Sequence, residues 1–253
     1  MASGEPGRPA HGLAGVPDAG AFLARLVRLD DGALVRLRSS GSRIALWARL
    51  PWGVLVTREV AGVGPADATV SAAAGVGSAD ATVSAAAAGV GFADATVSAA
   101  ELLAELAGGG TGLPTRRDDQ WRWPLPPPVS RAVESVASAE LSRLAAAAAG
   151  TLREAASAGV GGRVVGQRAL REALLDHVAL IVTPPEGRPV EVSQRLVQAV
   201  FRMGFLGPSG VDESSSRVCV APQWVGISAP FGVAWRQSVN TLAVRPMFTH
   251  PNG

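Results

Sequence analysis

The chain has 253 residues, 47% of them hydrophobic, and its 23 basic and 21 acidic side chains leave a formal net charge of +2 at neutral pH. A chain of this length can bury a sizeable core as one large or two small domains. The net charge is too small for the broad basic surface that binding to a phosphate backbone usually needs. We expect a cytoplasmic protein for three reasons. The single cysteine cannot form an internal disulfide, and the N-terminal residues lack the basic region followed by an apolar core that is typical of a signal peptide. The sequence also lacks a strongly apolar run of about 18 residues that could cross a membrane.

The first segment with a clear periodicity is a short amphipathic helix. Residues 1–16 are rich in Gly, Pro and Ala and are expected to form a disordered tail. Asp18 can then cap a helix in which Phe22 and Leu26 share one face while Arg25 points to water. An N-terminal helix packed on a core is therefore expected.

Three runs of alternating apolar and polar residues come after the helix. They cover 35–38, 43–50 and 54–57, and a turn at 51–53 separates the last two. Because successive side chains of a strand point to opposite faces, this alternation predicts an antiparallel meander with one face on a core.

A tandem triplication comes after the meander. Residues 62–73, 75–86 and 89–100 share the sequence GVG-x-ADATVSAA. In the third copy, Ser98 and Glu101 have the spacing of a capping box, so this copy is expected to start a helix through the leucines at 102 and 103. The first two copies lack that glutamate. We interpret them as an insertion in a surface loop, where extra length costs only about 0.6 kcal/mol per doubling.

The segment 108–129 contains the glycine-rich stretch GGGTG and the sequence WRWPLPPP. Three consecutive prolines exclude a helix and impose extended polyproline geometry. We interpret this segment as a strap or linker at a domain boundary.

Helix patterns dominate the next part of the chain. Apolar residues spaced by three and four from Ser130 predict a long helix, and a second helix is expected to end near His177. The apolar run 178–182 is compatible with helix or strand. A further helix is expected from Ser193, with Gly204 as its left-handed C-terminal residue.

Strands are expected in the remainder, at 218–220, 224–228, 233–235 and 242–244. The fold class is therefore α+β, with two small antiparallel β meanders, each preceded by helices, and a helical middle. The expected organisation is a tail at 1–16, an α+β domain at 17–107 with the triplicated insertion at 62–100, the strap or linker at 108–129, an α+β domain at 130–246 and a tail at 247–253.

No group of residues has the pattern of a known catalytic or cofactor site. Asp176, His177 and Cys219 include the residue types of a nucleophilic site, but His177 shares a helix face with leucines and Cys219 lies among valines, where a thiol is usually inert. Metal-binding motifs are missing. The glycine-rich stretch 108–112 lacks the lysine that a phosphate-binding loop needs. The stretch 159–162 follows a predicted helix, whereas the glycine motif of a dinucleotide site follows a strand. We therefore expect no catalytic residue, no cofactor and no metal.

Carboxylates lie among arginines along the predicted helices, which is typical of solvated helix faces with ion pairs at spacings of three and four. The residues concerned are Glu134, Glu140, Glu154 and Glu172, among Arg131, Arg143, Arg153, Arg168 and Arg171.

One alternative function is a winged-helix-like DNA-binding regulator. Helices at 164–177 and 193–203, with a β ribbon after them, have this outline, and Arg195, Gln198 and Arg202 would face the groove. About 15 residues with two adjacent prolines separate the helices, much more than the tight turn that positions a recognition helix. Nucleic-acid binding is therefore the second choice.

Two surfaces are candidates for binding a partner protein. Trp121, Arg122 and Trp123 of the strap could occupy a partner's groove, although tryptophans that cover the protein's own core are the more ordinary arrangement. The other candidate is the outer face of the first meander, which carries four arginines: Arg36, Arg38, Arg43 and Arg49.

The stretches LWARLPWGVLVTREV, ADATVSAAELLAEL, WRWPLPPP and WVGISAPFGVAW together resemble uncharacterised actinobacterial proteins, among them ParJ-like partners of the ParA chromosome-segregation ATPase. The resemblance implies a protein partner, in its most specific form a ParA-type ATPase. We therefore expect a non-enzymatic cytoplasmic protein-protein interaction module, a regulator or adaptor, for which homo-oligomers are also conceivable. An enzyme with an unrecognised site is the third alternative.

Overall fold

The computed structural model describes residues 9–63, 93–158, 166–184, 187–208 and 214–238. Its α-helices are α1 (Val16–Leu29), α2 (Ala99–Ala107), α3 (Ser138–Ala158), α4 (Gln167–Asp176) and α5 (Gln194–Arg202). Its strands are β1 (Leu34–Ser40), β2 (Arg43–Arg49), β3 (Leu55–Ala61), β4 (Asp94–Ser98), β5 (Arg131–Ala137), β6 (Val178–Val182), β7 (Val190–Ser193), β8 (Ser215–Ala221), β9 (Trp224–Ala229) and β10 (Gly232–Gln237).

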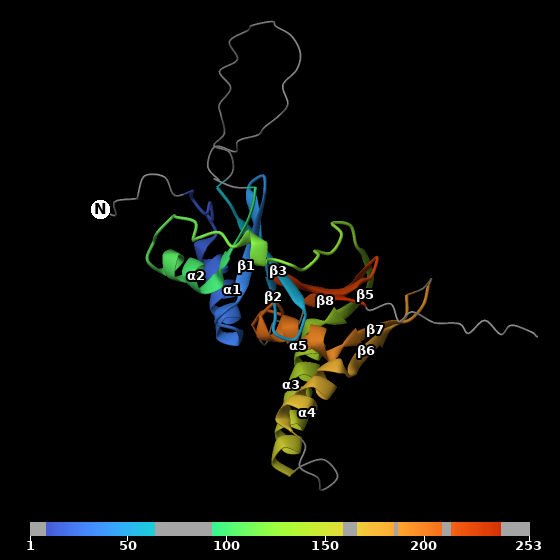
Figure 1. Ribbon diagram of the computed structural model, residues 1–253. Helices are drawn as coiled ribbons and strands as arrows, with labels where there is room; N and C mark the ends of the chain where they lie inside the picture. The colour runs from blue at the N-terminus through green and yellow to red at the C-terminus, as the bar shows by residue number, and fades with distance from the viewer. Residues whose placement is uncertain (1–8, 64–92, 159–165, 185–186, 209–213, 239–253) are drawn as a thin grey trace, which may run out of the picture.

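These elements form an eight-stranded antiparallel sheet in the order β4-β1-β2-β3-β10-β9-β8-β5, with β6 and β7 as a separate two-stranded sheet (Figure 1). The α+β fold class is confirmed.

The first half of the chain builds the predicted meander. β1 pairs with β2 and β2 with β3. Alternate residues of these strands, such as Leu37, Leu46 and Val56, are fully buried in one core with Phe22 and Leu26 of α1. The alternation of the sequence was therefore a correct guide to both the strands and the face that they bury.

The helix α1 begins earlier than the sequence suggested. It starts at Val16, and Gly15 is its N-cap without a side-chain hydrogen bond. The Asp18 carboxylate instead accepts a hydrogen bond of 2.6 Å from Arg58 of β3. The predicted cap at Asp18 is wrong, because Pro17 in the first turn has the backbone angle of a helix and favours an earlier start.

Part of the expected N-terminal tail, 1–16, is packed against the rest of the molecule. His11 is only 3% exposed; its Nδ1 accepts a hydrogen bond of 3.0 Å from the Leu13 backbone N–H, and its Nε2 lies 3.1 Å from the Gly110 carbonyl oxygen. The prediction of a disordered tail is thus wrong for residues 9–16, because this buried imidazole joins them to the glycine-rich loop after α2.

The third repeat copy forms the junction of β4 and α2. Ser98 is the N-cap of α2, and its hydroxyl accepts a hydrogen bond of 3.4 Å from the Glu101 backbone N–H. The predicted helix start is therefore confirmed. The Glu101 carboxylate, however, accepts a hydrogen bond of 2.5 Å from Arg117 rather than closing the capping box, since a charged donor is the stronger partner. The first two copies lie outside the described residues.

The two halves of the chain share one sheet, because β3 of the first half pairs with β10 of the second. The helix predicted from Ser130 is wrong over 131–137, which form β5. The half-buried residues of this strand, Val133 and Val136, are three positions apart instead of two. The cause is a shift in the register between β5 and β8 next to Val133. A bulge of this kind gives a strand the spacing of a helix. The division into two domains at 108–129 stays a prediction.

The helices α3 and α4 pack together and extend away from the large sheet, and α5 lies between them and the sheet (Figure 1). The run 178–182 is a strand, β6, and the β6–β7 hairpin separates α4 from α5. As the length of the connection predicted, the two helices are not joined by the tight turn that positions a recognition helix.

The C-terminal strands β8, β9 and β10 confirm the predicted meander. Gly204 comes after α5 with a φ of +67°, as predicted, and a Cβ there would approach the Arg25 guanidinium to 2.7 Å. The expected strand at 242–244 and the tail at 247–253 lie outside the described residues.

The large sheet carries apolar residues on both faces. Opposite the main core, a tryptophan cluster is formed by five buried residues: Leu55, Trp121, Cys219, Trp224 and Trp235. Trp235 lies over Gly226 of the neighbouring strand, where an added Cβ would come within 2.5 Å of the ring. Since Trp121 belongs to the strap, the strap covers this face of the sheet.

Candidate functional site

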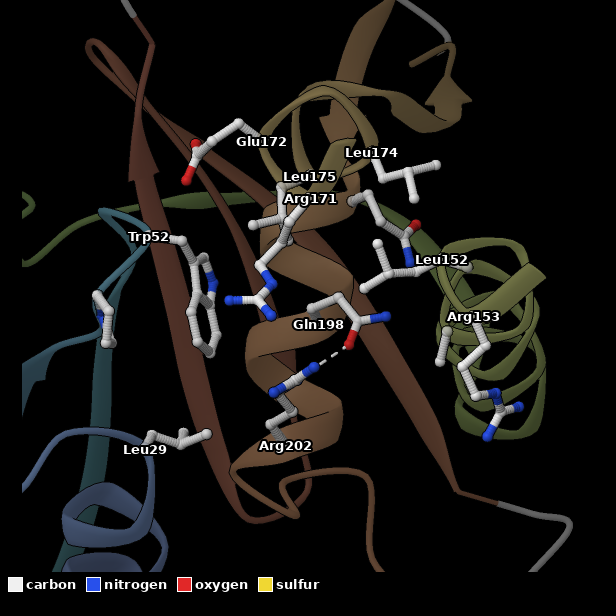
Figure 2. A pocket seen from close by; sticks show the side chains of 14 residues that line it. Leu29, Trp52, Leu152, Arg153, Arg171, Glu172, Leu174, Leu175, Gln198 and Arg202 are labelled. Atoms are coloured by element: carbon white, nitrogen blue, oxygen red, sulfur yellow. Dashed lines mark hydrogen bonds between the residues drawn. The ribbon is translucent and has the colours of Figure 1, made fainter. Parts of the chain in front are cut away.

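A cavity of about 470 Å³ lies between α3, α4, α5 and the turn after β2 (Figure 2). We call it the arginine pocket. Its apolar wall includes Leu152 of α3, Leu174 and Leu175 of α4 and Trp52 of the turn. Its polar lining includes Arg153, Arg171, Glu172, Gln194, Gln198 and Arg202. Its volume lies within the range of about 300–1,000 Å³ that is typical of ligand pockets.

The arginine pocket has an excess of positive charge. Arg153, Arg171 and Arg202 line it, and none of the three has an ion pair within the described part of the chain. Arg171 points into the cavity between Trp52 and Gln198 (Figure 2). A guanidinium stays charged at physiological pH and presents a fork of donors that fits carboxylates and phosphates. The pocket therefore favours an anionic ligand.

The acidic residue of the pocket lining, Glu172, is already neutralised. Its carboxylate accepts a hydrogen bond of 2.6 Å from Arg195, whose guanidinium also donates to both Asp176 oxygens, at 2.7 and 2.9 Å. The bond from Arg195 lowers the pKa of Asp176 below its usual value and is the largest cause of that shift. Two hydrogen bonds also connect Arg195 with Trp52. The Arg195 guanidinium donates to the Trp52 carbonyl at 2.9 Å, and the Trp52 indole N–H donates to the Arg195 carbonyl at 3.2 Å.

The pocket floor is held by a buried amide. Gln198 donates a hydrogen bond of 2.9 Å from Nε2 to the Ala145 carbonyl of α3 and accepts one of 3.3 Å from Arg202 (Figure 2). The Arg202 guanidinium lies 5.7 Å from the centroid of the Trp52 ring. The shape of the pocket is therefore fixed by contacts within the chain.

The three residues considered for DNA binding all lie in or beside this pocket. Gln198 is 6% exposed, and both ends of its amide are bonded. Arg195 has a side chain only 12% exposed and engaged in ion pairs. Arg202 alone is exposed. A recognition helix must present its side chains to base edges, and α5 does not present this set.

The tryptophans of the strap belong to the protein's own core. Trp121 is 9% exposed, and its indole N–H donates a hydrogen bond of 2.8 Å to the Trp123 carbonyl. The two rings meet edge to face with their centroids 5.3 Å apart. Arg122, between them, is exposed.

The strap also covers two of the four meander arginines. The Arg36 guanidinium lies 5.7 Å from the centroid of the Trp121 ring, and that of Arg49 lies 5.2 Å from the centroid of the Trp123 ring. Arg36 also donates two hydrogen bonds, of 2.7 and 2.6 Å, to the Asp94 carboxylate. The strap and the arginine face of the first meander, predicted as two separate partner-binding surfaces, are therefore in contact with each other in the structure.

The other two meander arginines also face carboxylates. Arg43 forms an ion pair of 3.0 Å with Glu59, and Arg38 lies 3.5 Å from Asp94. Two carboxylates thus face three of the four arginines, and Arg49 faces the Trp123 ring.

The residues considered for a nucleophilic site are far from a working arrangement. His177 is exposed at the C-terminal end of α4, not on a leucine face as expected, because the helix ends at Asp176. Burial in the tryptophan cluster raises the pKa of the Cys219 thiol, which disfavours the reactive thiolate. The described residues contain no cluster of three or more side chains suited to a metal, and no described helix is long and apolar enough to cross a membrane.

The sequence does not indicate the arginine pocket. Arg153 and Arg171 were expected to form ion pairs on solvated helix faces, whereas neither has one among the described residues. Trp52 was interpreted only as part of a turn. The pocket arises where three helices and this turn meet, and spacing within one helix carries no signal of such a meeting.

Two family models match two separate parts of the chain. Residues 13–92 match DUF8010, a domain of unknown function, and residues 125–241 match DUF8185, another domain of unknown function. No curated protein matches the sequence.

Solved structures of bacterial DNA polymerase sliding clamps are loosely similar in fold. A clamp from Pseudomonas aeruginosa, solved with a ligand, is 10% identical with a TM-score of 0.47, over 89% of this chain and 63% of that one. A DnaN clamp from Bartonella birtlesii bound to griselimycin is 11% identical with a TM-score of 0.49, over 92% and 65%. This chain thus spans less than two thirds of either clamp chain, and the similarity is too low to carry a function across.

The two matched ranges meet at the arginine pocket. Trp52 lies in 13–92, and Arg171 and Arg202 lie in 125–241. The pocket therefore exists only where the two parts of the chain are folded together.

Proposed function

We propose that the protein is a non-enzymatic protein-interaction module, a regulator or adaptor, and that its partner docks at the arginine pocket. The observation that carries this proposal is the charge of the pocket, where three arginines without an ion pair in the described chain lie beside leucines and an indole ring. Arginine and tryptophan are the residue types that most often dominate the energy of protein interfaces. The strap face is the weaker candidate, because three of its four arginines already face carboxylates of the same chain.

For the partner we propose a ParA-type ATPase, and for the place of action the cytoplasm. This identity is supported only by the sequence resemblance and is independent of the geometry of the pocket. Purified ATPase from the same organism is the direct test: we expect it to bind the wild-type protein in a titration. Absence of binding would remove this partner and leave the docking site to be tested separately.

Affinity capture with matched variants tests the docking site. Arg153→Ala with Arg171→Ala removes two pocket charges from α3 and α4, whereas Arg143→Ala with Arg168→Ala removes two exposed charges from the same helices outside the pocket. In a lysate of the source organism, we expect the wild-type protein and the control to retain a common protein that the pocket variant loses. Equal capture by all three proteins would contradict docking at the pocket.

A further inference from the structure

We infer that the arginine pocket recognises a short partner segment in which leucine-like side chains are flanked by acidic residues. This inference rests on the proposed function and specifies the chemistry of the segment that docks. Its basis is the separation of apolar and cationic groups within one cavity.

The apolar part of the pocket comes from α3, α4, Leu29 at the end of α1 and the turn after β2. Leu152 and Leu175 project toward the centre of the cavity in Figure 2, and the Trp52 indole faces them from the other side. The Trp52 ring is held in place by its hydrogen bond to the Arg195 carbonyl, so this wall is formed before a ligand arrives. Removal of this apolar surface from water stabilises the complex, which favours an aliphatic side chain in the ligand.

The cationic part surrounds this wall rather than meeting at one point. Arg153, Arg171 and Arg202 come from three different helices, and in Figure 2 the Arg153 guanidinium points away from those of Arg171 and Arg202. A single small anion such as inorganic phosphate therefore cannot meet all three at once. An extended segment with carboxylates on both sides of its apolar residues can meet several, and each carboxylate can be bound by a guanidinium fork.

The remaining polar groups of the pocket add selectivity for negative charge. Glu172 is neutralised by Arg195 at 2.6 Å, and the Gln198 amide is bonded at both ends. No unneutralised carboxylate of the described lining is therefore left to attract a basic segment. Lysine or arginine in the ligand would instead meet like charges, which is how interfaces reject wrong partners.

Labelled peptides test the inference. The probe is fluorescein-Gly-Asp-Asp-Leu-Leu-Asp-Asp-Gly, and its controls replace either the four Asp by Asn or the two Leu by Ser. Fluorescence anisotropy is measured with the wild-type protein, the Arg153→Ala/Arg171→Ala variant and the Arg143→Ala/Arg168→Ala variant. We expect the probe to bind the wild-type protein and the latter variant alike, and to bind the pocket variant about tenfold more weakly or worse. Both control peptides should also bind about tenfold more weakly.

Three results would overturn the inference: equal affinity for the Ser peptide, equal binding by the pocket variant, or displacement of the probe by millimolar inorganic phosphate, since a site for any anion needs no leucine wall.

Failure of the inference and failure of the proposed function give different combinations of results. If the pocket variant loses its captured partner but the probe does not bind, the docking site stands and the segment chemistry is wrong. If the probe binds as expected but capture is unaffected by the variant, the pocket has this chemistry and the partner docks elsewhere.

Discussion

At the scale of single residues, Arg195 connects parts of the chain that are distant in sequence. Its guanidinium bonds Glu172 and Asp176 of α4 and the carbonyl of Trp52, which lies 143 residues away. The Arg195 side chain is only 12% exposed, and its loss would leave the Trp52 carbonyl and the Glu172 carboxylate without this charged donor. Asp176 would keep an ion pair of 3.2 Å with Arg236. This residue therefore positions both the indole and α4 at the arginine pocket.

The pH dependence of stability tests this arrangement through Asp176→Asn. Arg195 holds the pKa of Asp176 below its usual range in the folded protein, so the pair stabilises the fold above the unfolded-state pKa of about 3.9 and is lost as the pH falls through the lower folded pKa. We expect the wild-type protein to be more stable by about 0.5–1 kcal/mol at neutral pH, because half of the Asp176 side chain is exposed. Urea unfolding should show this difference closing between about pH 5 and 2.

The matched control is the same substitution in an Arg195→Gln background. There the effect of Asp176→Asn should shrink, because the largest cause of the lowered pKa is gone and only the ion pair of 3.2 Å between Asp176 and Arg236 is left. A stability difference that stays constant from neutral to acidic pH in the wild-type background would show that Arg195 and Asp176 are not coupled.

Trp121→Ala tests the covering role of the strap. Because Trp121 is buried in the tryptophan cluster, truncation should open a cavity and cost about 3–5 kcal/mol of the free energy of unfolding. Arg122→Ala, at the exposed neighbouring position, should change it by less than about 0.5 kcal/mol. Denaturant unfolding measures both. A Trp121→Ala protein of wild-type stability that fails to bind a partner would make the strap a candidate docking surface again.

At the scale of elements, the third repeat copy differs from the first two because it leads directly into α2. Ser98→Ala removes the N-cap of α2 and should cost about 0.5–2 kcal/mol of stability. Ser84→Ala, at the same place in the second copy, should have almost no effect. Thermal melts of the two variants compare them directly, and equal losses would contradict the assignment of the third copy as the one that forms α2.

Deletion of 62–74 or of 62–88 should leave cooperative folding intact. The Gly62 N–H donates a hydrogen bond of 2.8 Å to the Ser42 carbonyl, and a Cβ at Gly62 would come within 2.9 Å of the Ile44 side chain. Either deletion brings the GVG of a later copy to this place, so the required glycine is restored. Circular dichroism and melting curves test this, and loss of a cooperative transition would show that the removed residues contribute to the core.

The sequence predicted elements wherever local periodicity and burial agree. Val35 and Leu37 alternate with arginines and form a strand with one buried face, as expected. β5 was missed because a register shift gives it helical spacing, and the burial of His11 was missed because its contacts are 99 residues away. The arginine pocket was missed for a related reason: helix crossings depend on long-range packing that no single segment specifies.

At the scale of the whole molecule, the large sheet separates two different surfaces. On one face the strap closes the tryptophan cluster, and the nearby arginines face rings or carboxylates of the same chain. On the other side lie α5 and the arginine pocket, where three positive charges have no ion pair within the described residues. We therefore expect a partner to bind on the helical side.

Hydrogen–deuterium exchange of the wild-type protein, alone and with its captured partner, measures the position of the docking site most directly. We expect the partner to slow exchange in α4 and in the second half of α3, the segments that carry Arg171 and Arg153, and to leave the strap at 118–128 unchanged. Protection confined to the strap and the meander strands, with α3 and α4 exchanging as in the free protein, would contradict docking at the arginine pocket.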